Sequence, residues 1–481
     1  MSKSLKKNFL LNFFNTVTVV LFPVITFPYA SRILMADGIG QINFLKSIVD
    51  YVGMFVLLGI PMYGVREVAK VRDNPEKRTK ISLEILLLSL FLTLLGYLVI
   101  AVLGYSITKV RNELPLFMVL SSSIFLMTIG SEWFYKGVED FKYITIRGLI
   151  VKIISLFLLF FLVKNKTDLM WYAIYNVFGV AGGNFFNLFR LRMYIDFKNV
   201  KWLELSIFRH FRFTLHSFAL NLFFVIYITL NVLMLGFLDT NEGVGYFSAA
   251  TKLIQVALTV VSSLGMVMLP RLSNLLSEQQ NERFVDLSQK ALQFILAISL
   301  PISAGLFLLA GLIIPLFCGD SYQPAIDTLK IVSPLISVIG LSSFIGIQIL
   351  YPQGKEKIVM VWIILSTIIN IGLNFLLVPL YSFNGAAIAS VVAQLILLIS
   401  LIFYSKDIVL VGFINSFMRY LFATFIMVIA IWLSLFLYLP KFLKLIFCLS
   451  IGGVVYSLIL LIFKDFIYLQ IRSFLLDRKK V

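Results

Sequence analysis

The sequence predicts an all-α integral membrane protein of about 14 transmembrane helices. Hydrophobic residues make up 60% of the 481 residues, charged residues only 14%, and the mean hydropathy is +0.97. A membrane-spanning helix needs about 20 mostly apolar residues, and it satisfies its own backbone hydrogen bonds in lipid. In chain order the predicted spans are residues 9–31, 42–64, 82–107, 115–136, 146–163, 169–189, 213–238, 246–269, 291–317, 328–351, 358–380, 384–404, 418–438 and 444–463.

The first span follows a basic start, as a signal peptide would. Its apolar run is too long for a signal peptide and lacks a small-residue cleavage site, so we expect it to be retained. The later spans are joined by loops too short to hold a soluble domain. Any binding site is therefore expected among the helices.

Lysine and arginine collect in every second loop, and this pattern indicates how the spans are oriented. The N-terminus, the loops after the second and sixth spans and the C-terminus lie on the basic side, which holds about 31 of the 41 Lys and Arg residues. Because cytoplasmic loops carry the excess of Lys and Arg, we expect both termini in the cytoplasm and an even number of spans. Anionic membrane lipid at that leaflet explains the net charge of +17, and no nucleic-acid partner is expected.

The sequence offers no basis for metal, cofactor or nucleotide chemistry. Its two cysteines, Cys318 and Cys448, and its two histidines, His210 and His216, show no spacing typical of a zinc site or a disulfide framework. It contains no P-loop or other nucleotide motif. We therefore expect no metal, no cofactor and no ATP-driven step within this chain.

Two external turns echo each other 205 residues apart. Gly38-Ile39-Gly40 precedes the second span and Gly243-Val244-Gly245 precedes the eighth, and each of these spans carries a lysine about two turns inside. We interpret the echo as a parallel repeat of two six-helix lobes around a central cavity, as in rocker-type transporters. The expected parts are residues 1–200 (N-lobe), 201–410 (C-lobe) and 411–481 (two additional transmembrane helices and a basic cytoplasmic tail).

Several motifs stand at the ends of spans. They are P-Y-A-S-R-I-L at 28–34, G-I-P-M-Y-G-V-R-E at 59–67, E-W-F-Y-K-G at 132–137, N-I-G-L-N-F-L-L-V-P at 370–379 and N-G-A-A-I-A at 384–389. In this order they resemble bacterial polysaccharide flippases of the O-antigen transporter type, within the superfamily that also holds multidrug extruders and the lipid II flippase. The resemblance covers nearly the whole chain. Met35 is a departure, since such sequences often have Gly there.

The resemblance implies a transporter of the bacterial cytoplasmic (inner) membrane and not an enzyme. It implies that the protein moves undecaprenyl-diphosphate-linked oligosaccharide repeat units from the inner to the outer leaflet by alternating access, for surface polysaccharide biosynthesis. The implied partners are this lipid-linked glycan, membrane lipid and, as a candidate, a polysaccharide polymerase.

Charged side chains inside spans are candidates for binding the diphosphate, because each costs about 2.5–3.5 kcal/mol at a helix centre unless it faces a cavity or a partner. Lys46 and Asp50 lie four residues apart on one helix face. They form either a structural pair or a site in which Lys46 attracts the diphosphate. Lys252 has no acidic residue within a turn and is the stronger candidate, with snorkelling to the surface as its alternative. Arg32 is a candidate for the exit or an interfacial anchor, and Lys152 is a candidate for the entry.

Glu84, Glu132 and His216 are candidates for proton or cation coupling, and so is Asp50 as an alternative to its pairing with Lys46. The alternative for each is structural. The two glutamates would pair with the basic inner loops, and the histidine would be hydrogen-bonded inside its helix bundle.

Asparagine rows are a second polar signal. Asn8, Asn12 and Asn15 form a stripe on the first span, and Asn176 and Asn187 share a face of the sixth. Such side chains are ordinary contacts between membrane helices, worth about 0.6–2 kcal/mol. They also suit a wetted cavity wall that binds sugar hydroxyls.

Two other functions stay open at this point. A MATE-type cation-coupled multidrug antiporter needs a membrane carboxylate for the coupling ion, and the first, seventh and eighth spans hold no Asp or Glu inside the bilayer. A membrane-embedded glycan polymerase or ligase would need a large external loop for its catalytic residues, and the outer loops are short. Both facts favour the flippase.

Overall fold

The computed structural model describes residues 3–196, 202–409 and 413–463, with side chains except those within 3–21, 216–217, 219–228 and 263–267. All regular secondary structure in these ranges is helical, which confirms the predicted fold class. The chain forms two compact units, Met1–Gly245 and Tyr246–Val481, and each is described by itself. The lobe boundaries at residues 200 and 410 stay predictions.

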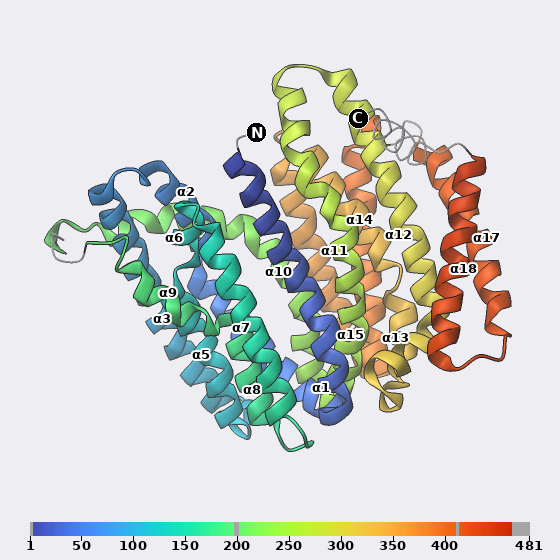
Figure 1. The fold of residues 1–481 in the computed structure, drawn as a ribbon, viewed down its shortest axis with the longest axis horizontal. Coiled ribbons are helices and arrows are strands. Elements are labelled where there is room, and N and C mark those ends of the chain that lie inside the picture. Colours follow the sequence, from blue (N-terminus) through green and yellow to red (C-terminus); the bar gives the residue numbers. More distant parts are fainter. Residues whose placement is uncertain (1–2, 197–201, 410–412, 464–481) are drawn as a thin grey trace. The chain divides into compact units, whose positions relative to one another are not determined.

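The first unit consists of α1 to α10 and the first residues of α11 (Figure 1). Its elements are α1 (Lys3–Leu57), α2 (Ile60–Val71), α3 (Pro75–Ser106), α4 (Thr108–Arg111), α5 (Leu114–Gly130), α6 (Glu132–Gly137), α7 (Phe141–Leu162), α8 (Leu169–Val177), the π-helical η1 (Phe178–Gly182), α9 (Asn184–Leu191), the 3₁₀ turns η2 (Trp202–Glu204) and η3 (Ile207–His210), α10 (Phe211–Leu238) and the start of α11 (Asn241–Ser277). Helix α1 contacts α3, α5, α7 and α10, so the unit is assembled around it.

The second unit holds the rest of α11 and the helices up to α18. Its elements are α12 (Asn281–Cys318), η4 (Asp320–Tyr322), α13 (Ala325–Val332), α14 (Leu335–Ser343), the π-helical η5 (Phe344–Leu350), α15 (Glu356–Tyr404), α16 (Lys406–Val409), α17 (Phe413–Leu435) and α18 (Lys441–Ile462). Helix α12 contacts α13, α14, α17 and α18. Both cysteines are buried.

Ten helices of the described chain are long and apolar enough to cross a membrane. One of them, Phe22–Val71, holds part of the predicted span 9–31 and all of 42–64, and another, Glu356–Tyr404, holds 358–380 and 384–404. The predicted span 169–189 is divided by the π-helical turn η1, and part of 213–238 lies among the side chains that are not described. Helix α3 exposes Leu94, Leu98 and other large apolar side chains, as a lipid-facing helix does.

The two long helices α1 and α15 are each divided by one residue in the left-handed backbone region. Met35 (φ 57°) separates the predicted spans 9–31 and 42–64, and Ser382 (φ 52°) separates 358–380 and 384–404. Glycine adopts such angles at the least cost. Met35 therefore holds a conformation for which the glycine common in the resembling sequences is better suited.

The two echoed turns pack against each other within the first unit. A Cβ on Gly40 would lie 1.7 Å from the carbonyl oxygen of Asn241, and a Cβ on Gly245 would lie 2.0 Å from that of Ala36. In the proposed repeat, with its offset of 205 residues, Ala36 corresponds to Asn241 and Gly40 corresponds to Gly245. The contact of Gly40 with Asn241 is therefore equivalent to that of Gly245 with Ala36. Glycine is required at both positions because the backbones approach so closely.

Helices α17 and α18 pack through a small residue, and this contact gives a first testable prediction. A Cβ on Gly452 would lie 2.7 Å from the Ile431 side chain, whereas nothing lies within 4 Å of one on the exposed Gly453. Because overpacking costs about 1–3 kcal/mol, Gly452→Leu should lower the melting temperature of the purified protein. Gly453→Leu is the matched control and should leave it within about 1 °C. Equal shifts for both variants would contradict the packing.

Candidate functional site

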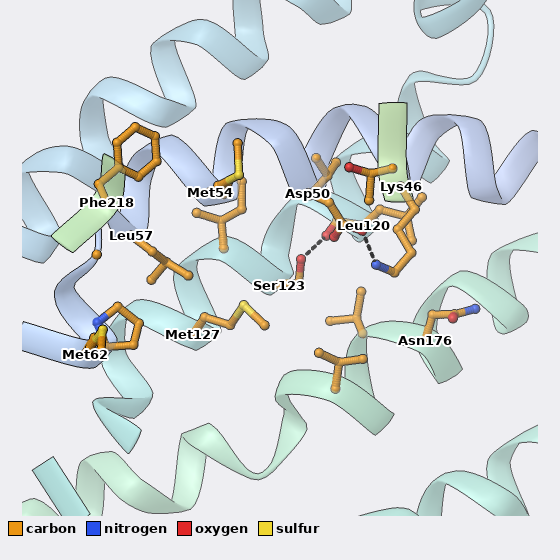
Figure 2. Close-up of a pocket in the computed structure, with 18 residues that line it drawn as sticks. Lys46, Asp50, Met54, Leu57, Met62, Leu120, Ser123, Met127, Asn176 and Phe218 are labelled. Atoms are coloured by element: carbon orange, nitrogen blue, oxygen red, sulfur yellow. Dashed lines mark hydrogen bonds and ion pairs between the residues drawn. The ribbon is translucent and has the colours of Figure 1, made fainter. Parts of the chain in front are cut away.

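The first unit contains a pocket of about 410 Å³ between the second half of α1, the start of α2, α5, α8, η1 and α10 (Figure 2). The residues that line it include Lys46, Asp50, Gly53, Met54, Leu57, Pro61, Met62, Leu120, Ser123, Met127, Asn176, Val180, Phe218 and Thr229. Of the predicted site residues, it brings together Lys46, Asp50 and Asn176. A volume in this range suits a small molecule or one part of a larger ligand.

The break between α1 and α2 forms part of the pocket wall. Leu58 (φ 40°) and Gly59 (φ 70°) take left-handed angles, which stop α1, and Pro61 stands in the first turn of α2. Proline suits this position because the first helical N–H groups need no partner within the helix. The break turns Met62 toward the pocket.

A charge pair stands in the pocket wall. The Lys46 ammonium donates to the Asp50 carboxylate at 2.5 Å, one helical turn along α1. Their side chains keep 33% and 38% of their exposure. The pair is therefore formed and is also accessible from the pocket.

The pocket has a polar end and an apolar end. Figure 2 shows Lys46, Asp50 and Asn176 at one end, and Met54, Met62 and other apolar side chains at the other. Methionine adapts its shape to irregular ligands because its side chain is flexible and polarizable. The arrangement fits an amphipathic ligand whose anionic part lies near Lys46.

Two predicted carboxylates lie outside the pocket and are paired. Glu84 is fully buried and accepts hydrogen bonds from Arg209 and from the Ser206 N–H. Glu132 accepts from Lys136 at 2.9 Å and from Arg147 at 3.2 Å. Both carboxylates are thus paired with basic side chains, as the structural alternative expects, and their coupling roles stay predictions.

Other predicted residues are placed elsewhere. Asn187 of α9 donates to the Gly130 carbonyl, so it joins α9 to α5 and does not line the pocket. The Lys152 ammonium of α7 is buried without a hydrogen-bond partner. Arg32 is exposed on α1, and Lys252 is half-buried on α11 in the second unit.

Four predicted residues cannot be placed. The side chains of Asn8, Asn12, Asn15 and His216 lie outside the described residues. Their roles stay predictions.

Several residues of the site were not predicted. Ser123, Met54 and Met127 line the pocket, but nothing in their sequence positions distinguishes them from other apolar or small residues of a span. His210 is not among the predicted candidates because it precedes the predicted span 213–238. In the structure it is 3% exposed and contacts Glu84. The adjacent Arg209 and the reduced hydropathy of this segment were the signals that could have indicated a polar cluster.

Known families match the chain in two regions. The family model described as polysaccharide biosynthesis protein matches residues 5–276, more than half of the chain. The model described as MatE matches residues 217–376.

Individual proteins are also similar. A protein of Shigella dysenteriae named "Putative O-antigen transporter" is 26% identical over 402 residues, which cover 82% of this chain and 98% of that protein. The structure of the lipid II flippase MurJ in an inward closed conformation superposes with a TM-score of 0.77 at 18% identity, covering 95% and 98%. An inward-facing multidrug resistance MATE family transporter of the MOP superfamily superposes with a TM-score of 0.61 at 14% identity, covering 83% and 94%. At these identities the two structures show a shared fold.

Proposed function

The chain belongs to the polysaccharide biosynthesis protein family, and from this premise we propose that it is a flippase for lipid-linked oligosaccharides. Its substrate would be an undecaprenyl-diphosphate-linked repeat unit, moved from the inner to the outer leaflet of the bacterial cytoplasmic membrane by alternating access. We also propose cytoplasmic termini, the two lobes and additional helices defined by the sequence, and a polysaccharide polymerase as a partner.

The observation that carries the proposal is the position of Lys46. It lies 11 residues after the kink at Met35 and 11 residues before Leu57, the last residue of α1. At 1.5 Å per residue each distance is roughly 17 Å, about half the thickness of the bilayer core. A cation retained there usually serves a ligand pathway or a charge pair.

The Lys46–Asp50 pair gives the Lys46 ammonium an anionic partner when no substrate is bound. Without substrate, Asp50 neutralises Lys46. A bound diphosphate would replace Asp50 as the partner of Lys46 through charge-assisted hydrogen bonds of the same kind. The pocket is too small for a whole repeat unit, so the glycan would extend beyond it.

The names of similar proteins support the same function. An O-antigen transporter and a lipid II flippase both appear among them, and each name refers to a lipid-linked or surface glycan. The flippase reading requires an anionic ligand, and Lys46 in the pocket supplies the matching cation.

Transport by the reconstituted protein tests the proposal. Liposomes that contain the protein and an undecaprenyl-diphosphate-linked oligosaccharide are treated with a membrane-impermeant glycosidase, and the rate at which protected glycan becomes cleavable is measured. Lys46→Ala should lower this rate by about 10- to 100-fold, because a hydrogen bond to a charged group contributes about 1.5–3 kcal/mol. Asp50→Ala should retain much more of the rate, since Lys46 remains.

The second unit offers a matched control. Lys290 and Asp286 form another pair four residues apart, at 2.6 Å on α12, and they do not line the pocket. Lys290→Ala should leave the transport rate within about twofold, as expected for an exposed pair. Equal losses in Lys46→Ala and Lys290→Ala would contradict a role of Lys46 in binding.

One observation favours a second function. Asp50 gives the pocket a carboxylate, which a cation antiporter would need, and the chain shares its fold with a MATE transporter. In that case Asp50→Ala would abolish transport of an organic cation, and Lys46→Ala would not. The pairing of Asp50 with Lys46 favours the flippase, because it occupies the carboxylate.

A further inference from the structure

A second polar cluster joins three elements of the first unit away from the pocket. Glu84 of α3 is 0% exposed, His210 of η3 is 3% exposed and Tyr63 of α2 is 5% exposed. Buried titratable groups in contact with one another are costly unless each is hydrogen-bonded, and these are. Hydrogen bonds link Glu84 to His210 and His210 to Tyr63.

The two shorter hydrogen bonds of His210 indicate which ring nitrogen carries the proton. His210 Nε2 is 2.9 Å from the Glu84 carboxylate, and His210 Nδ1 is 2.7 Å from the Tyr63 hydroxyl. The Arg209 Nε–H also points at Nε2, at the longer distance of 3.3 Å. We assign the Nε2 hydrogen to the shorter contact, in which the Glu84 carboxylate accepts it. Nδ1 of the neutral ring is then an acceptor, and the Tyr63 hydroxyl donates to it.

The surroundings of His210 favour this neutral form. Burial lowers the pKa of His210 from its ordinary value of 6.5, the Glu84 carboxylate raises it, and the Arg209 guanidinium lowers it. The Glu67 carboxylate of α2 also raises the pKa of His210. The Arg66 guanidinium lies over the ring of Tyr63, the hydrogen-bond partner of His210. At neutral pH the site is therefore without its second proton.

Adding that proton changes the hydrogen bond to α2. A protonated Nδ1 can only donate, so the Tyr63 hydroxyl must stop donating and turn its own hydrogen elsewhere. Tyr63 stacks on Phe213 of α10 at 6.1 Å and directly follows Met62, which lines the pocket. Tyr63 thus connects His210 to the part of α2 that forms the pocket wall.

We propose that His210 and Glu84 form a proton-binding site of the transporter, whose occupancy is communicated to the substrate pocket through Tyr63 and α2. The proposal rests on the proposed transport function only for its effect on the pocket. The binding of the proton itself is independent of what is transported.

Nuclear magnetic resonance measures the site directly, because the chain has only two histidines. In His216→Gln protein with ¹³C-labelled histidine, the remaining ring should titrate with a pKa below its ordinary 6.5, because it is buried. Adding Glu84→Gln should lower this pKa further, since the anion is lost. Adding Tyr63→Phe should raise it, because the donor to the neutral ring is lost. Opposite shifts of the His210 pKa in the two variants are expected only if Glu84 and Tyr63 both hydrogen-bond to this ring. Shifts of the same sign in both variants, or no shift in either, would overturn the proposal.

The pH dependence of stability gives a second measure. A folded-state pKa below 6.5 means that the unfolded chain binds more protons between the two values. The stabilising contribution of neutral His210 is therefore present above about pH 6.5 and is lost as the pH falls through the lowered pKa. His210→Gln should flatten the melting temperature across this window. An unchanged pH profile would contradict the assignment.

Transport separates the two proposals. In the liposome assay the wild-type rate should change as the pH falls through the His210 pKa, and the rate of His210→Gln should not. If the pKa shifts appear but lipid-linked glycan is not transported, the proposed function fails and the proton site stands. If wild type and His210→Gln transport glycan with the same pH profile, the coupling fails and the flippase stands.

Discussion

Gly40→Ala and Gly245→Ala should each remove most of the folded protein from the membrane. In both cases the new Cβ would lie within 2.0 Å of a backbone carbonyl oxygen, where ordinary contact begins at 3.4 Å. A carbonyl cannot rotate away as a side chain can, so the kink of α1 and the start of α11 would have to separate. We expect a loss of about 3 kcal/mol or more, at the upper end of overpacking costs. Membrane abundance and melting temperature measure it.

The same turns contain their own controls. A Cβ on Gly38 would meet the end of the Leu169 side chain at 2.8 Å, and one on Gly243 would meet the Asp239 carboxylate at 2.4 Å. Both neighbours are side chains that can change rotamer at about 1 kcal/mol. Gly38→Ala and Gly243→Ala should therefore keep abundance near that of the wild type. If all four variants behave alike, backbone contact is not what the glycines provide.

Much of the fold could be predicted because hydropathy and helix length are local properties. Every predicted span overlaps helices of the described chain, although 42–64, 115–136 and 328–351 each cross a short break between two helices. What the sequence could not show is how some spans are joined. The predicted gaps at 32–41 and 381–383 contain Met35 and Ser382, but in each gap a single residue of positive φ makes the break and the helix continues on both sides of it. The sequence also does not indicate that the π-helical turn η1 divides the sixth predicted span.

The candidate site could be predicted only in part, for a physical reason. Lys46 and Asp50 were found because a spacing of four places both on one face of a helix, whatever surrounds it. The remainder of the pocket comes from α5, α8 and α10, whose positions depend on packing between helices. Asn176 and Asn187 share a face in an ideal helix, yet Asn176 lines the pocket and Asn187 binds Gly130. The π-helical turn between them removes the shared face.

Glu132→Ala should destabilise the first unit by about 3 kcal/mol, because it leaves a buried guanidinium without its carboxylate. Arg147 is 10% exposed and donates to Glu132 at 3.2 Å. It also donates to the Asn184 side chain at 3.4 Å and lies over the Tyr143 ring, and neither group supplies a negative charge. The effect lies at the low end of losses for broken buried pairs, since Glu132 itself is 37% exposed. The free energy of unfolding in detergent, by denaturant titration, is the measurement.

The double variant Glu132→Ala/Arg147→Met distinguishes a lost charge partner from lost packing. It removes both charges and keeps most of the apolar volume of the arginine stem, so we expect it to recover at least half of the loss. Lys136→Ala is the control on the other side of Glu132. It removes a partner at 2.9 Å that is 48% exposed, and such a pair contributes less than about 1 kcal/mol. A double variant no more stable than Glu132→Ala would show that the carboxylate stabilises α6 and α7 by something other than the charge of Arg147.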